Sequence, residues 1–170
     1  NRCRRQRQMC IRDRKIRFEA YKNKRSEVTK KNVPLGEGVT LVRDMFVADT
    51  MEEAKEMAGE HMVNYMKWVC HWRGLGNHMD PGEELPETKG KLDLLNYEFL
   101  HQRNMLFGTP EYVIDKIHEL KSELNLQNLQ VWSNFPGVKH KDCMKSIKLF
   151  TEKVMPHFKD DLDTEVKKVS

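Results

Sequence analysis

Apolar positions recur at steps of three and four residues in two long segments, which predicts two amphipathic helices. The first runs from Thr50 to about Trp72, and Thr50 with Glu53 three residues later has the pattern of a capping box. The second follows Thr109, a good N-cap residue, and places Pro110 at the first helical position. Its expected buried stripe consists of Val113, Ile117, Leu120 and Leu124.

Two segments rich in β-branched and apolar residues predict strands at 38–49 and 129–135, both of them buried. Weaker patterns predict an exposed helix from residue 15 that ends near Pro34, and a last helix over about 141–158. This last helix is expected to bury four apolar side chains, those of Met144, Ile147, Phe150 and Val154.

Strands that are separated by helices of this length cannot form a hairpin, so the pattern favours parallel βα units and an α/β fold. Two predicted strands are too few for a complete parallel sheet. The Gly- and Pro-rich segment 73–91 lies between them and predicts a long loop, which is either a lid over a site or a surface insertion.

Charge is unevenly distributed along the 170 residues, whose net charge is +4. Residues 1–14 contain six arginines and Asp13, a local charge of +5, which leaves −1 for residues 15–170. A nucleic-acid-binding role therefore depends on the first fourteen residues alone. No apolar run is long enough to cross a bilayer and no secretion signal is visible, so we expect a cytoplasmic protein without a membrane partner.

Candidate metal ligands and nucleophiles do not form a recognisable motif. The seven histidines show no His-Glu-x-x-His pattern, and the four cysteines show no paired spacing, so the sequence predicts no metal site. Cys70 and Cys143 lie near apolar helical positions and are expected to be small buried hydrophobic residues.

Three stretches resemble the carboxy-terminal end of the bacterial luciferase-like flavin-dependent monooxygenase family. They are "VRDMFVADTMEEAKE" at 42–56, "FGTPEYVIDKIHEL" at 107–120, and a final helix that contains Ser146, Leu149, Phe150, Val154, Met155 and Pro156. The resemblance covers residues of about 38–158. It implies an α/β chain that is the carboxy-terminal fragment of a (β/α)8 TIM barrel, about the last two βα units plus a preceding helix, within residues 15–160. Residues 161–170 would then be a charged tail.

The resemblance also implies chemistry for a full-length parent. Such enzymes use reduced FMN and O2 to oxygenate a small organic substrate, and some relatives use a deazaflavin instead. A flavin reductase would be a possible partner, and the full-length protein would be a dimer. The isolated chain is expected to be inactive, because an open barrel edge exposes unpaired amides and apolar surface.

The active site of a barrel lies at the carboxyl ends of its strands, which here are 48–50 and 133–137. Ser133 and Asn134 are therefore candidates to face the flavin or the substrate, or they satisfy backbone groups at the start of the loop. Trp132 either stacks on the flavin ring or packs under a covering helix. No catalytic residue is assigned, because the family residues that hold the flavin phosphate lie mostly on earlier strands.

The first fourteen residues have neither a helical nor an alternating apolar period. Codons CAG-ATG-TGT-ATA-AGA-GAC-AGR encode residues 8–14 and are similar to the transposon end that is used to tag DNA for sequencing. We therefore predict that residues 1–14 are adapter-derived and not native. The alternative is a natural basic arm of a small nucleic-acid-binding protein. A further alternative for the whole chain is a non-catalytic luciferase-like barrel subunit.

Overall fold

The structure, a computed structural model, describes residues 2–73 and 95–159, with side chains from residue 14 onward. Its three strands are β1 (Thr40–Val47), β2 (Met105–Gly108) and β3 (Asn128–Trp132). The helices are α1 (Arg2–Thr29), α2 (Met51–Ala54), α3 (Glu60–Arg73), α4 (Tyr97–Arg103), α5 (Pro110–Leu124) and α6 (His140–Leu149). A π-helical turn (Lys55–Gly59) joins α2 to α3, and two further turns (Phe150–Val154 and Met155–Phe158) extend α6.

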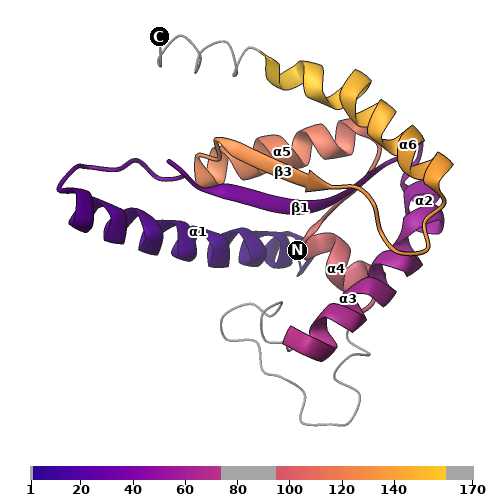
Figure 1. The fold of residues 1–170 in the computed structure, drawn as a ribbon, viewed down its shortest axis with the longest axis horizontal. Helices are drawn as coiled ribbons and strands as arrows, with labels where there is room; N and C mark the ends of the chain where they lie inside the picture. The colour runs from indigo at the N-terminus through magenta and orange to yellow at the C-terminus, as the bar shows by residue number, and fades with distance from the viewer. Residues whose placement is uncertain (1, 74–94, 160–170) are drawn as a thin grey trace.

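The strands form one parallel sheet in the order β2-β1-β3, so the α/β class with parallel strands is confirmed. β1 is central: its second half pairs with β2, from Asp44↔Met105 to Val47↔Gly108. Its first half pairs with β3, from Thr40↔Asn128 to Asp44↔Trp132. α5 leads from β2 to β3, so this connection crosses β1 (Figure 1).

The expectation of two strands was wrong, because β2 is a third strand that the sequence pattern did not reveal. β2 has only four residues, all of them buried, and it lies between the end of α4 and the N-cap of α5. Such a short apolar run shows no period, so the sequence pattern does not distinguish it as a strand.

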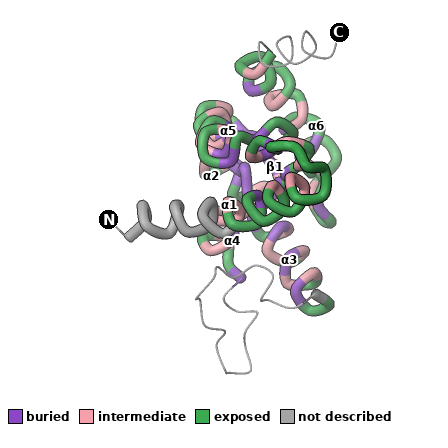
Figure 2. The backbone as a smooth tube through the Cα atoms, turned by 90° about the vertical axis from the view of Figure 1, so that its left-hand side faces the viewer, coloured by how far each residue is buried: buried purple, intermediate pink, exposed green. Residues whose placement is uncertain are grey.

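Both faces of the sheet are covered by helices, and side-chain alternation along β1 divides the core into two clusters. Met45 and Val47 pack with Phe18 of α1 and with the whole predicted stripe of α5. Phe46 and Ala48 pack against α2, α3 and α4, where α3 and α4 lie side by side (Figure 1). Figure 2 shows the buried positions of β1 at the centre of the molecule, whereas residues 14–29 of α1 are largely exposed.

Helix starts follow the predicted caps. The Thr50 hydroxyl accepts a hydrogen bond from the Glu53 amide at 3.0 Å, and the Thr109 hydroxyl accepts one from the Tyr112 amide at 3.3 Å. The reciprocal bond of the capping box is shifted by one residue, because the Glu53 carboxylate accepts from the Asp49 amide and not from that of Thr50. α5 ends at Asn125, whose left-handed backbone (φ 48°) closes the helix.

Three sequence expectations need correction. The backbone of residues 2–29 forms one helix, although residues 1–14 have no helical period. In the last helix, Val154 is buried as expected, but Met144 is 50% exposed, Ile147 and Phe150 are half-buried, and Cys143 and Ser146 take the buried positions. β3 is a half-exposed edge strand and not a buried one, because its second neighbour is missing among the described strands. Most of the predicted loop 73–91 and the tail 161–170 lie outside the described residues.

Candidate functional site

The carboxyl ends of the three strands do not lie level with one another. β1 and β2 end together, but β3 ends opposite Asp44, in the middle of β1. The segments that follow β1 and β3, residues 48–50 and 133–137, each contribute a buried side chain, Ala48 and Phe135, to the same apolar cluster. These are the two segments that sequence reasoning assigned to the carboxyl edge.

α6 supplies the hydrogen bond that β3 does not give to β1. The Val47 amide donates to the Ser146 hydroxyl at 2.7 Å, and the Ser146 hydroxyl lies 3.8 Å from the sulfur of Met45. Ser146 has no exposed surface. Because a buried amide without a partner is costly, this bond fixes α6 at the end of β1.

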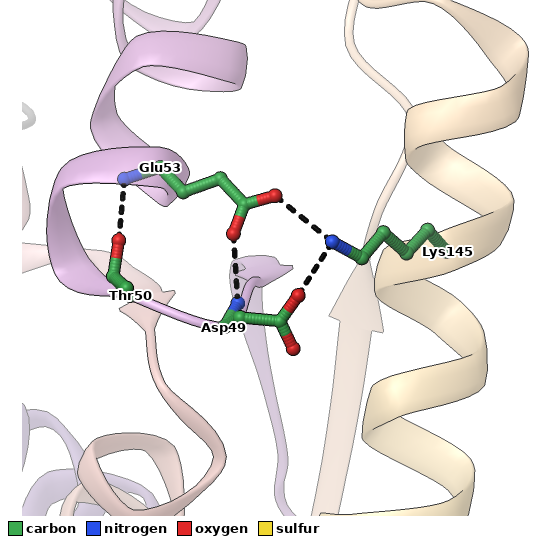
Figure 3. A network of polar contacts seen from close by, with 4 residues as sticks. All are labelled: Asp49, Thr50, Glu53 and Lys145. Carbon is green, nitrogen blue, oxygen red and sulfur yellow. Dashed lines mark hydrogen bonds and ion pairs between the residues drawn. The ribbon is translucent and has the colours of Figure 1, made fainter.

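A polar network joins α6 to the start of α2, and Figure 3 shows its four residues. The Lys145 ammonium donates to the Asp49 carboxylate at 2.6 Å and to the Glu53 carboxylate at 2.9 Å. These two hydrogen bonds raise the pKa of Lys145, first that to Asp49 and then that to Glu53. The network carries two carboxylates and one ammonium, so its own net charge is −1.

Ser133 and Asn134 lie directly after β3, where they were expected. Ser133 is half-buried and Asn134 is exposed. The Asn134 carbonyl accepts a hydrogen bond from the Trp132 indole at 2.8 Å, and its side-chain oxygen lies 3.8 Å from the Cys143 sulfur. Asn134 thus stabilises the turn between β3 and α6 while its side chain stays accessible.

Trp132 belongs to an aromatic group that joins β3 to α3. Its ring centroid lies 6.5 Å from that of Tyr65, which lies 6.4 Å from that of Trp68. Trp132 is 51% exposed and Trp68 is 62% exposed. The indole of Trp132 therefore contacts a helix on one side and solvent on the other.

Two groups of aromatic side chains lie beside this edge, a buried phenylalanine pair and a stack of three rings. Phe135 is buried and its ring centroid lies 5.5 Å from that of Phe107. His101 is stacked between Tyr97 and Tyr112, with centroid distances of 5.1 and 5.3 Å, and its Nε2 atom lies 2.7 Å from the Phe107 carbonyl oxygen. Burial, followed by the proximity of Tyr112 and Glu98, raises the pKa of Tyr97.

The cysteines of the described side chains, Cys70 and Cys143, are free and buried, as predicted. Burial raises the pKa of both thiols, which makes them poor nucleophiles. No group of three or more His, Cys, Asp or Glu side chains is close enough to hold a metal ion within the part of the chain that the structure describes.

A flavin mononucleotide needs an apolar or aromatic surface for its ring and cations or amides for its phosphate. Trp132 offers the first, but the nearby Lys145 is engaged by Asp49 and Glu53 in a negatively charged network. Among residues 14–73 and 95–159, the carboxyl edge thus does not fit a complete FMN site. We derive no reaction step from these residues.

Comparison with known proteins identifies solved structures with a similar fold. No family model matches the sequence, and no curated protein matches it. Among solved structures, the chain is similar to a type II Baeyer-Villiger monooxygenase, the oxygenating constituent of 3,6-diketocamphane monooxygenase from the CAM plasmid of Pseudomonas putida in complex with FMN. The TM-score is 0.55 at 21% identity, over 82% of this chain and 38% of that one.

The chain is also similar to the monooxygenase RslO1 from Streptomyces bottropensis, with a TM-score of 0.56 at 16% identity, over 85% of this chain and 37% of that one. This chain has the fold of part of these TIM-barrel monooxygenases. It spans well under half of their length. The expected fold class is confirmed by this partial match.

Sequence reasoning located the segments at the carboxyl edge but missed Lys145 and Ser146 as the residues that join them. Both contacts link positions about a hundred residues apart. A lysine and a serine on a helix carry no local signal of such partners. The local feature of the sequence at this point is the pair Asp49 and Glu53 at the capped start of α2, whose two negative charges a lysine can neutralise.

Proposed function

We propose that the chain is the carboxy-terminal part of a flavin-dependent monooxygenase whose full-length form oxygenates a small organic substrate. The observation that carries the proposal is the fold match to two monooxygenases, one of them in complex with FMN, over more than four-fifths of this chain. The motifs at 42–56 and 107–120 support it independently, since they come from the sequence alone.

In this proposal reduced flavin would supply the electrons that activate O2 for oxygenation of the substrate when it is bound to the parent protein. The cofactor is FMN in its reduced form, and a deazaflavin is the alternative. The described residues contribute position and exclusion of water, through the Phe135–Phe107 contact and the α6 connection.

Ser133 and Asn134 are the proposed residues that face the flavin or the substrate. Their place after β3, the half-buried state of Ser133 and the accessible side chain of Asn134 support this role. The phosphate would be held by residues of the parent protein outside the described part, because Lys145 at the carboxyl edge is already engaged by Asp49 and Glu53. A flavin reductase and a second copy of the parent protein are proposed partners.

A second candidate is a non-catalytic barrel subunit, which keeps the fold without a flavin site. The incomplete fit of the carboxyl edge to FMN is the observation that favours this non-catalytic candidate. No helix among the described residues is long and apolar enough to cross a membrane.

The test begins with the source DNA, which should be read upstream of the Lys15 codon so that the whole gene can be expressed. The product should bind FMN and consume reduced FMN faster when a substrate is present. The substrate panel should include ketones, because one matched structure is a Baeyer-Villiger enzyme. A folded full-length product that binds no flavin would support the subunit alternative and exclude the enzyme.

A further inference from the structure

One face of the sheet is uncovered over the first half of β1. On this face Val42 is 48% exposed and Asp44 is half-buried, whereas Phe46, the next residue on the same face, is buried among residues of α2, α3 and α4. β3 pairs with this half of β1, and its residues on the same face are exposed as well: Asn128, Gln130 and Trp132. Asp44 therefore lies where the helical cover of this face begins.

Asp44 is a carboxyl group without a partner on this face. Its register partners are Met105 of β2 and Trp132 of β3, and residues paired in this way lie about 4.8 Å apart on the same side of a sheet. Asp44 makes no hydrogen bond or ion pair with any described residue. Burial raises the pKa of its carboxyl to about 6, so at pH 7.5 the group is mostly ionised. Its charge is then not neutralised by the described part of the chain.

The aromatic group described above begins beside this carboxyl, because one of its members is the register partner. From Trp132 it continues to Tyr65 and Trp68, with interplanar angles of 37° and 23° between successive rings. Both indoles are more than half exposed. Aromatic faces attract cations, and indole does so most strongly. The cations that lie over rings in the described part contact Tyr97 and Phe99, so the faces of this group are open to a ligand.

The combination of one carboxylate and several aromatic faces selects a class of ligand. An alkylated ammonium ion presents its charge on methyl groups, which need no hydrogen-bond acceptors and which contact aromatic faces well. A metal ion would need several oxygen, nitrogen or sulfur ligands, and no group of three suitable side chains is close enough among the described residues. An anion would be repelled by Asp44.

We propose that Asp44 and the aromatic group bind a small alkylammonium ion. The carboxylate would balance the charge of the ion, and the indole of Trp132, beside it on β3, would contact its methyl groups. Tyr65 and Trp68 would extend this contact onto α3. The ligand would supply the charge that the fold lacks at Asp44, which accounts for a carboxyl group at a position where an uncharged side chain would be more stable.

The test uses the whole chain and choline, titrated at pH 7.5 and constant ionic strength and followed by isothermal calorimetry and tryptophan fluorescence. The wild type should bind choline saturably, with a change in tryptophan emission. The uncharged isostere 3,3-dimethyl-1-butanol has the same shape without the positive charge. It should bind about tenfold more weakly, because it loses the attraction to the carboxylate and to the ring faces.

Two pairs of variants separate the site from general effects of charge and exposed apolar surface. Asp44→Asn should weaken choline binding about tenfold, whereas Asp115→Asn, an exposed residue on α5 with the same charge, should change it less than twofold. Trp132→Leu should weaken binding about fivefold. Its control is Trp72→Leu, because Trp72 is 71% exposed on α3 and its ring contacts only His71.

Four results would overturn the assignment. They are no saturable choline binding by the wild type, equal affinity for choline and its uncharged isostere, equal loss of affinity in Asp44→Asn and Asp115→Asn, and unchanged affinity in Trp132→Leu. Thermal unfolding shows whether each variant is folded. If Trp132→Leu does not fold, Trp68→Leu on the surface of α3 keeps the test and should weaken binding severalfold. None of these measurements requires flavin, so they are independent of the monooxygenase proposal.

Discussion

The Ser146 hydroxyl accepts a hydrogen bond from the Val47 amide at 2.7 Å, across 99 positions of sequence. A helix side chain here replaces the neighbouring strand, because β3 pairs with β1 only as far as Asp44. The bond therefore places α6 over the open end of the central strand, beside both segments of the carboxyl edge.

Ser146→Ala should destabilise the chain by about 1–3 kcal/mol, since it leaves the buried Val47 amide without an acceptor. Chemical denaturation followed by circular dichroism measures this loss. Ser122→Ala is the control, because Ser122 is exposed on α5 and bonds only to its own helix. Equal effects of the two substitutions would show that the Val47 bond does not hold α6.

The free energy of unfolding should fall as the pH rises from about 4 to above 6, because of the titration of Asp44. Burial raises the pKa of its carboxyl from 3.8 to about 6, so the folded chain holds a proton that the unfolded chain has already released, and folding is penalised as the pH increases. Asp44→Asn should remove this slope and add about 1–2 kcal/mol at pH 7.5.

Unfolding free energies from pH 4 to pH 8 test this. The exposed Asp115→Asn variant on α5 serves as the reference and should keep the slope. A wild-type curve that rises between pH 4 and pH 6, with the rise abolished in Asp44→Asn, would contradict the assignment.

Lys145 should couple weakly to its two carboxylate partners. All three side chains are partly exposed, and exposed ion pairs contribute about 0.2–1 kcal/mol. A double-mutant cycle of Lys145→Met with Glu53→Gln should give a coupling energy in this range that decreases with added salt. A coupling that is independent of salt would show that the network is not an exposed ion pair.

Gly36→Ala should cost more than Gly38→Ala, although both glycines have positive φ angles of 80° and 72°. At Gly36 a Cβ atom would overlap the Asn125 carbonyl oxygen, which is backbone and cannot move aside. At Gly38 it would meet the end of the flexible Arg25 side chain. We expect backbone strain to lower the free energy of unfolding of both variants by about 1 kcal/mol. The overlap at Gly36 should lower that of Gly36→Ala by at least about 1 kcal/mol more, as measured by urea denaturation.

The parts of the fold that sequence predicted are those with local signals. The caps at Thr50 and Thr109 and the stripe from Val113 to Leu124 depend on neighbours within four residues, and they are confirmed. β2 was missed because four buried residues show no period. Met144 was misplaced because the face of α6 that is buried is set by Ser146 and Cys143, through contacts with β1 and with the turn after β3.

The candidate site shows the same difference between features with local signals, which the sequence reveals, and long-range contacts, which it does not. The segments around Asp49 and Ser133 were found because they follow predicted strands. The network of Lys145 and the Ser146 contact with Val47 depend on side chains brought together from distant elements, and no spacing in the sequence indicates them.

The central claim is tested most directly by expressing the complete gene, recovered by reading the source DNA upstream of the Lys15 codon, and supplying its product with reduced FMN, labelled oxygen gas and a ketone panel. The account predicts that the protein binds FMN and that one labelled oxygen atom appears in an organic product. A folded protein that binds no flavin and incorporates no label would contradict it.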